Sequence, residues 1–365
     1  MSAGFAPWQQ RVFERATRAH AAGRLPHALL LCGPERMGKR ALAEALAQAI
    51  VCTTPNADGS ACGRCVACTR FCSRYQRDPL ETRPDDSPAH PAGHAGHPDV
   101  RFVGFALNEK ASPRKMYQEL VIEQVRELSA WLALTPSSER GKVALIEPAH
   151  LLNQAAANAL LKTLEEPVPG RYVLLVTDQP ARLPATIRSR CQRFELKLPV
   201  RDEALDWLRE QGESTVRAEA ALAANLGHPG LALAELRDGG AALRNEVAKD
   251  LVALASGRAQ AGAVATTWIA DRLGQRLRLA VEALREFAAG AAGGTSAGSR
   301  LGEAGLAPGT DARRLANWFD EANRAQALLR SPLRQDLLLA DLLRRWRDLA
   351  APGSGTGYPG ASNRL

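Results

Sequence analysis

A glycine-containing stretch near the N-terminus has the residue types that bind phosphate. Gly33 and Gly38 frame four residues and Lys39 follows, which is the G-x-x-x-x-G-K order of a nucleotide-binding loop. In such a loop the backbone N–H groups hold the phosphate and the lysine neutralises it. The motif continues with Ser or Thr, whose hydroxyl binds magnesium, but here the next residue is Arg40, which offers no oxygen. The loop therefore predicts phosphate binding at a site that has lost one metal ligand.

The segment that would supply the carboxylates of a nucleotide hydrolase is altered as well. The apolar run 142–146 is typical of a buried strand, and it ends at Glu147-Pro148, where a hydrolase carries Asp-Glu. The first carboxylate of that pair assists the metal and the second orients the attacking water. Glu147 is thus a partial replacement, and Pro148 removes the second function. We therefore expect no ATP hydrolysis, while passive ATP binding through Lys39 stays open.

Thr177 is a further candidate for the nucleotide site. It ends the apolar run 172–177, and parallel sheets bind ligands at the carboxyl ends of their strands. A plain strand-ending threonine is an equally good interpretation. The candidates for cofactor binding are therefore Gly33, Gly38, Lys39 and Thr177.

Four cysteines have the spacing of a structural zinc site. Nine residues separate Cys52 from Cys62, and two C-x-x-C steps then place Cys65 and Cys68. Four thiolates complete a tetrahedral zinc site with no open position, which favours a structural ion over a catalytic one. Four free thiols are the alternative, and Cys72 is a substitute ligand that the pattern does not require. Because the chain is expected to be cytosolic, metal is favoured over disulfides.

Segment 78–98 is rich in Pro, Asp, Gly and His. Such a composition does not fill a core, so it predicts a flexible, solvated loop. His90, His94 and His97 are residues of a type that binds metal, but chance histidines in a solvated loop are the favoured interpretation.

The apolar runs of the first half alternate with helical patterns, which predicts an α/β fold with a parallel sheet. From Pro199 onward the pattern is helical, first in a small lid and then in a separate bundle. Residues 288–310 have the Gly/Ala/Ser composition of a loop, and the tail after Pro352 is expected to be disordered.

The formal net charge of +8 favours nucleic acid or an acidic protein as a partner, although an ordinary basic soluble protein is the alternative. The sequence has no apolar region typical of a signal peptide and no apolar run of about 18 residues or more. We therefore expect a soluble, cytoplasmic protein.

Four stretches in this order resemble the clamp-loader subunits of bacterial DNA polymerase III: LPHALLLCGPERMGK, C-x9-C-x-x-C-x-x-C, NQAAANALLKTLEEP and LPATIRSRC. The resemblance covers most of residues 5–240. It implies an AAA+ ATPase-like domain with an inserted zinc module, a three-helix lid, and a helical collar that assembles a hetero-pentamer. The expected bounds are 1–198 for the AAA+ domain with its zinc module at about 52–72 and a flexible insert at about 78–98, 199–242 for the lid, 243–350 for the collar and 351–365 for the tail.

The resemblance also separates classes within this family. The motor subunits (gamma/tau) need the hydroxyl after the loop lysine and the Asp-Glu pair, which Arg40 and Glu147-Pro148 replace here. The delta subunit, which opens the clamp, lacks the cysteine module and the Ser-Arg-Cys sequence. The delta prime class remains. It implies a non-catalytic, stator-like subunit that helps to load the sliding clamp onto primed DNA, beside gamma/tau and delta, at the replisome on the bacterial nucleoid.

Arg190 is the residue through which such a subunit is expected to act, with Ser189 beside it. In the family, the arginine of Ser-Arg-Cys reaches the ATP that a neighbouring motor subunit holds. A guanidinium is planar and permanently charged, so it can stabilise charge on a transferring γ-phosphate. The alternative is that Arg190 only forms a structural salt bridge.

Two other functions stay open at this point. One is an active ATPase motor of the same family, favoured by Gly33, Gly38 and Lys39. The other is a zinc-dependent DNA-binding protein, favoured by the charge and the cysteines, although no recognition-helix signature accompanies them.

Overall fold

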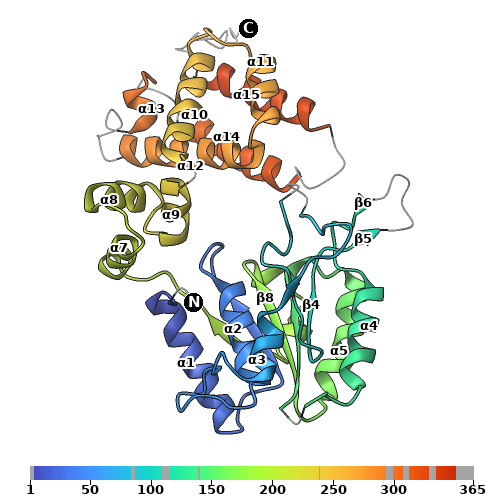
Figure 1. The fold of residues 1–365 in the computed structure, drawn as a ribbon. Coiled ribbons are helices and arrows are strands. Elements are labelled where there is room, and N and C mark those ends of the chain that lie inside the picture. Colours follow the sequence, from blue (N-terminus) through green and yellow to red (C-terminus); the bar gives the residue numbers. More distant parts are fainter. Residues whose placement is uncertain are drawn as a thin grey trace, which may run out of the picture. The chain divides into compact units, whose positions relative to one another are not determined.

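The computed structural model describes residues 4–83, 87–108, 115–138, 140–237, 239–292, 299–306, 312–328 and 334–350 (Figure 1). The chain divides into two compact units, Met1–Ala234 and Glu235–Leu365. The predicted tail 351–365 and residues 84–86 of the predicted insert lie outside the described residues. The division between the units falls within one helix, so the predicted lid and collar bounds stay predictions.

A five-stranded parallel sheet forms the centre of the first unit. Every described side chain of the three middle strands is at least half-buried, because helices cover both faces of the sheet. The middle strands are the apolar runs that the sequence predicts. In spatial order the strands are β4 (Val100–Val103), β7 (Lys142–Ile146), β8 (Arg171–Thr177), β1 (Ala28–Cys32) and β9 (Gln192–Glu195).

Alternate strand residues enter two separate cores, as the period of two along a strand requires. Leu29 and Leu31 pack with helices α1 (Pro7–Ala21) and α2 (Lys39–Val51), whereas Leu30 packs on the opposite side. Helices α4 (Ile122–Ala133), α5 (Gln154–Glu165) and α6 (Ala185–Arg188) cover that opposite side, and α4 and α5 are seen together in Figure 1. The predicted α/β class with a parallel sheet is confirmed.

Short elements and one helical group complete the first unit. They are helix α3 (Val66–Cys72); the strand pairs β2 (Arg74–Tyr75) with β3 (His94–Ala95) and β5 (Leu107–Asn108) with β6 (Lys115–Met116); the 3-10 turns η1 (Ala149–Leu151) and η2 (Pro180–Arg182); and helices α7 (Arg201–Glu210), α8 (Thr215–Ala224) and α9 (Pro229–Arg237). Trp8 of α1 meets Trp207 of α7 edge to face, at 5.1 Å between ring centroids. This contact joins the helical group to the sheet domain.

The second unit is helical where it is described. Its helices are α10 (Gly240–Ala255), α11 (Ala261–Ala270), α12 (Leu273–Ala292), α13 (Arg300–Glu303), α14 (Ala312–Leu328) and α15 (Gln335–Ala350). Trp268, Trp318 and Trp346 are fully buried in its core. Each indole N–H finds an oxygen acceptor; that of Trp346 donates to the Leu251 carbonyl at 2.8 Å. Burial of these rings therefore leaves no indole N–H unpaired.

The loop predicted over residues 288–310 is only partly correct. Helix α12 continues to Ala292, because alanine favours helix more strongly than any other residue, and α13 forms a further short helix. The glycine-rich middle, 293–298, and the end, 307–310, lie outside the described residues. Among the described helices, none combines the length and apolarity needed to cross a bilayer.

Candidate functional site

The phosphate loop lies between β1 and α2, at the carboxyl edge of the sheet, and it is packed tightly against its own chain. A Cβ on Gly33 would lie 2.2 Å from the Leu196 carbonyl oxygen, and φ is +141° there, so only glycine fits. A Cβ on Gly230, in α9, would lie 2.1 Å from the Arg36 carbonyl oxygen of the loop. The loop backbone is therefore in close contact with segments that follow β9 and that begin α9.

Lys39 uses its ammonium group within the loop. Its Nζ donates to the carbonyl oxygens of Gly33 at 3.0 Å and Pro34 at 2.6 Å. The side chain is buried, and this burial lowers its pKa, although the charges of Asp178 and Glu147 act in the opposite direction. The ammonium group that would neutralise a phosphate is thus engaged with backbone oxygens.

Arg40 forms ion pairs at the position where a nucleotide hydrolase has a metal-binding hydroxyl. Its Nε donates to Glu44 at 2.7 Å, and its Nη1 donates to Glu147 at 2.8 Å. Its Nη2 lies 2.6 Å from Nδ1 of His90. The guanidinium therefore neutralises Glu147 and Glu44, and its contact with His90 joins the start of α2 to the insert.

Thr177 lies at the same edge of the sheet, as predicted from its strand. Its hydroxyl accepts from the Gln179 N–H at 3.0 Å and lies 3.0 Å from Nδ1 of His150, which in turn lies 3.3 Å from Asp178. The sequence interpretation missed His150 and Asp178. His150 follows Glu147 by three residues, which was the available signal. The structure thus brings Lys39, Glu147 and Thr177 to one edge: Thr177 ends β8, Glu147 follows β7, and Lys39 begins the helix after β1.

Arg190 lies apart from these residues in sequence, two residues after the end of α6, and is exposed. Its Nη2 pairs with Glu165 at 2.6 Å, its Nη1 donates to the Thr186 carbonyl at 2.9 Å, and 36% of its side chain is accessible. Ser189 is also exposed and donates to the same carbonyl at 3.1 Å. Cys191 is buried, which raises its pKa to about 12, so it anchors the segment rather than reacting. Glu165 was missed, although it stands within the Leu-Glu-Glu-Pro sequence that ends α5.

The four predicted zinc ligands lie together. The Sγ atoms of Cys52, Cys62, Cys65 and Cys68 are all within 4.8 Å of one another, with Cys52 and Cys65 at 3.8 Å. Exposed Cys72 is outside this cluster. The position of the cluster follows from the chain: Cys52 caps the end of α2 and Cys65 begins α3.

Hydrogen bonds within the cluster suit thiolate ligands. The hydroxyl of Thr54 lowers the pKa of Cys62 to about 7. For Cys65, burial acts to raise the pKa, but hydrogen bonds from Thr53 and from the Cys68 N–H outweigh it and bring the pKa to about 5. Burial raises the pKa of both Cys52 and Cys68, so a cation is needed to hold all four groups as thiolates. The donor set fits a structural zinc ion, which stays a prediction.

The prediction of chance histidines in a solvated loop over 78–98 is wrong for the histidines, although Asp78, Leu80 and the described prolines of the segment are exposed. Glu81, His90, His94 and His97 are all at least 94% buried. Burial, followed by the charge of Arg40, lowers the pKa of His90 to about 2, so its ring is neutral. Composition failed here because polar side chains can be buried when they pair with one another. Glu81 was not recognised from the sequence as the partner of His90 and His94.

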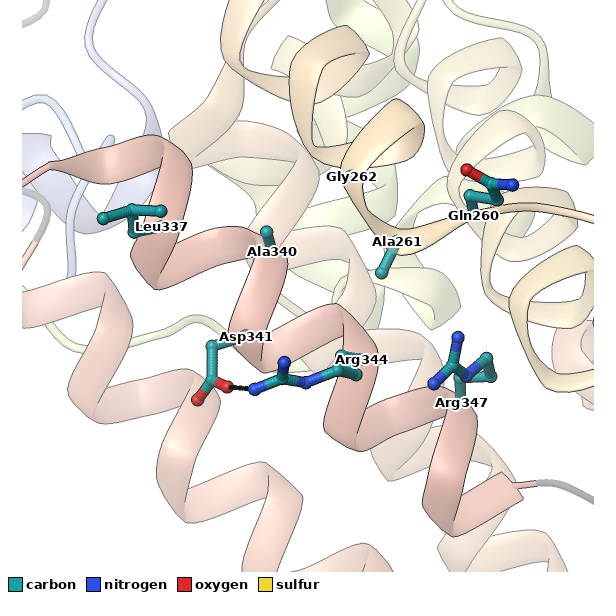
Figure 2. A pocket seen from close by; sticks show the side chains of 8 residues that line it. All are labelled: Gln260, Ala261, Gly262, Leu337, Ala340, Asp341, Arg344 and Arg347. Carbon is teal, nitrogen blue, oxygen red and sulfur yellow. Dashed lines mark hydrogen bonds and ion pairs between the residues drawn. The ribbon is translucent and has the colours of Figure 1, made fainter.

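The second unit carries a hollow of about 650 Å³ between α11 and α15 (Figure 2). Asp341 and Arg344 are hydrogen-bonded to each other on its α15 side. None of the residues predicted to bind nucleotide, zinc or a neighbour's phosphate lines it.

The fold and the site define a class: an α/β domain with a G-x-x-x-x-G-K loop after its first strand, in which Arg40 follows the lysine, and with helices after the sheet. Residues 8–199 match the model of the family described as "DNA polymerase III, delta subunit". The chain belongs to this family.

Relatives with curated names agree with this membership. The chain is 37% identical over 203 residues to the DNA polymerase III subunit delta' of Pseudomonas aeruginosa, covering 55% of this chain and 52% of that protein. It is 37% identical over 229 residues to subunit delta' of Escherichia coli, covering 62% and 60% respectively. It is also 32% identical over 189 residues to subunit tau of Escherichia coli, covering 52% and 24%. The chain thus spans about half to three fifths of the length of the delta' relatives that it matches.

Proposed function

We propose that this chain is a non-catalytic, stator-like subunit of a bacterial clamp loader, and that it supplies Arg190 to the ATP site of a neighbouring motor subunit. In this role it helps to load the sliding clamp onto primed DNA and does not hydrolyse ATP itself. Its partners are the motor subunits (gamma/tau) and delta, in a hetero-pentamer.

One observation carries the proposal: the Arg40 guanidinium is ion-paired with Glu147 at 2.8 Å. A hydrolysing site needs a hydroxyl and carboxylates around magnesium, and a second carboxylate to orient water. Here a fixed positive charge is paired with Glu147, which stands in for the first carboxylate of the Asp-Glu pair, and Pro148 cannot orient water. Because Lys39 is also bonded to loop carbonyls, ATP turnover by this chain is not expected.

The opposite situation at Arg190 supports its action on another subunit. Its guanidinium is exposed and contacts one surface carboxylate, one carbonyl and the Ser189 hydroxyl. A surface ion pair of this kind is worth about 0–1 kcal/mol, so a neighbour's phosphate can replace it. Ser189 and buried Cys191 hold the backbone that presents the arginine.

The helices of the second unit are proposed to provide assembly, and the zinc module is proposed to be structural. If these parts provide assembly and stability, Arg190 is not needed for complex formation and can act only on ATP hydrolysis by the neighbouring motor subunit. This separation makes the proposal testable, because a residue that contributes in the transition state lowers turnover more than binding.

The test is the substitution Arg190→Ala in a complex reconstituted with motor and delta subunits. Gel filtration and mass measurement should find an intact complex. A trans-acting arginine is worth about 10³–10⁵ in rate at its own site. Other motor sites continue to hydrolyse, so we expect a partial loss of clamp- and DNA-stimulated ATPase and a larger loss of clamp loading.

Two matched variants sharpen this test. Arg190→Lys keeps the charge but loses the planar fork, so it should recover little activity. Arg188→Ala removes a nearby exposed arginine, the last residue of α6, and should load clamps normally. Normal loading by an intact Arg190→Ala complex would leave Arg190 with a structural role only.

A further inference from the structure

The insert between the cysteine cluster and β4 contains a second group of side chains with metal-binding chemistry. One ligand atom each from Glu81, His90 and His94 lies within 4.8 Å of the others. Oε2 of Glu81 is 2.8 Å from Nε2 of His94 and 3.3 Å from Nε2 of His90. Ligands about 2.0–2.2 Å from a zinc ion lie about 3.3 Å apart in a tetrahedron, so only small movements would admit an ion.

One atom of this group lacks a hydrogen-bond partner. Nε2 of His90 is buried and makes no hydrogen bond, because its contact with Glu81 lacks the necessary geometry. The whole His90 side chain is 98% buried. A Cβ on Gly104 would lie 3.2 Å from this nitrogen, so the absence of a side chain at Gly104 leaves the nitrogen uncrowded. A buried polar atom without a partner costs free energy that a bound ion would recover.

The surroundings orient the three groups. Nη1 of Arg77 donates to Oε1 of Glu81 at 2.8 Å, which leaves Oε2 directed at the histidines. The ring of Phe102 lies beside both imidazoles, with centroid distances of 6.1 Å to His90 and 5.9 Å to His94. Hydrogen-bonded outer partners and an apolar wall are features that orient and shield metal ligands in proteins.

We propose that Glu81, His90 and His94 bind a divalent transition-metal ion of the zinc type, separately from the cysteine cluster. Two imidazoles and one carboxylate suit zinc and its neighbours rather than magnesium or calcium, which prefer oxygen ligands. Three protein ligands leave a fourth position to water. His97 is not part of this close group of ligand atoms, and its Nδ1 accepts from the Asp99 N–H at 3.1 Å.

Arg40 makes this site sensitive to the phosphate loop. A guanidinium has no acceptor, so Nδ1 of His90 accepts from Arg40, and the neutral ring carries its proton on Nε2. When a metal ion binds Nε2, that proton moves to Nδ1 and Nη2 of Arg40 withdraws. The ion pairs of Arg40 with Glu44 and Glu147 can persist, because they use Nε and Nη1. Metal binding and the Arg40–His90 hydrogen bond therefore compete.

The experiment counts zinc in the full-length chain by elemental analysis after saturation and gel filtration. The unmodified chain should hold two ions, one on the cysteines and one at this site. Glu81→Gln and His94→Gln should each hold one. His97→Gln is the control: it alters a buried histidine of the same segment and should keep two.

Arg40→Gln provides a test that does not depend on losing a ligand. It removes the competing hydrogen bond and a nearby positive charge, so the second ion should bind at least about tenfold more tightly. Cobalt titration of the zinc-loaded chain measures this affinity, and its spectrum should lack thiolate charge-transfer bands. A single ion in both the unmodified chain and Arg40→Gln would overturn the proposal. So would a second ion that persists in a folded Glu81→Gln/His94→Gln variant.

Discussion

The phosphate loop and the Arg190 segment both carry cations suited to phosphate, yet the two regions are built in opposite ways. Lys39 and Arg40 are largely buried, and each has several partners in its own chain. Arg190 is exposed and has one carboxylate partner at the surface. Breaking a buried ion pair costs about 3–5 kcal/mol, whereas a surface pair is worth about 0–1 kcal/mol. The comparison teaches that a motif residue does not by itself make an active site. Whether its side chain can bind phosphate depends on the groups that it already contacts in the folded chain.

The largest effect is expected from Cys65→Ser, which should lower the zinc content and weaken the region of the phosphate loop, while leaving the Arg190 segment unchanged. Helix α2 begins at Lys39, directly after the phosphate loop, and its C-terminal end is followed by Cys52. Loss of zinc would therefore loosen the C-terminal end of this helix. Loss of even an outer partner of a zinc ligand costs about 10–100-fold in affinity, and loss of a ligand should exceed this. Elemental analysis should find about one zinc fewer per chain. Full zinc retention would contradict the cysteine ligand set.

Arg40→Thr tests whether the ion pairs of Arg40 stabilise the phosphate-loop region and whether their loss allows ATP hydrolysis. The substitution restores the missing hydroxyl but leaves the largely buried carboxylates of Glu44 and Glu147 without this partner. We expect the free energy of unfolding to fall by about 3 kcal/mol, measured by urea denaturation. ATP hydrolysis should not appear, because Pro148 still replaces the second carboxylate. A stable variant that hydrolyses ATP would contradict the view that the phosphate loop, unlike the Arg190 segment, is held in an inactive state by buried ion pairs.

The smallest effect is expected from Glu165→Gln at the other region. The pair with Arg190 is exposed, so its removal should change the free energy of unfolding by less than about 1 kcal/mol. Clamp loading by the reconstituted complex should be unchanged or slightly faster, since Arg190 no longer has to leave a carboxylate. Strong loss of loading in this variant would mean that Glu165 positions the arginine.

Much of the fold was accessible from local sequence patterns. The apolar runs 142–146 and 172–177 are short and are bounded by turn-forming residues, which favours buried strands, and the glycines of the loop mark its turn. The cysteine spacing likewise predicted a cluster that the structure contains. These features depend on neighbours in sequence, which is why they could be recognised without coordinates.

The insert shows where that approach fails. Its composition is that of a solvated loop, and its burial depends on Glu81, His90 and His94 meeting one another and Arg40, which is 50 residues from His90. Pairing over such distances leaves no periodic signal. The partner of Arg190 was missed for the same reason, because α5 and the Arg190 segment approach each other only in the folded chain.

ATP turnover by the purified chain, with and without Lys39→Ala, tests the central claim most directly. A chain whose loop cations are engaged internally should release phosphate at the background rate in magnesium, and Lys39→Ala should not change that rate. The same preparation should support clamp loading once motor and delta subunits are added. Hydrolysis above background that disappears in Lys39→Ala would contradict the account and make this chain a motor.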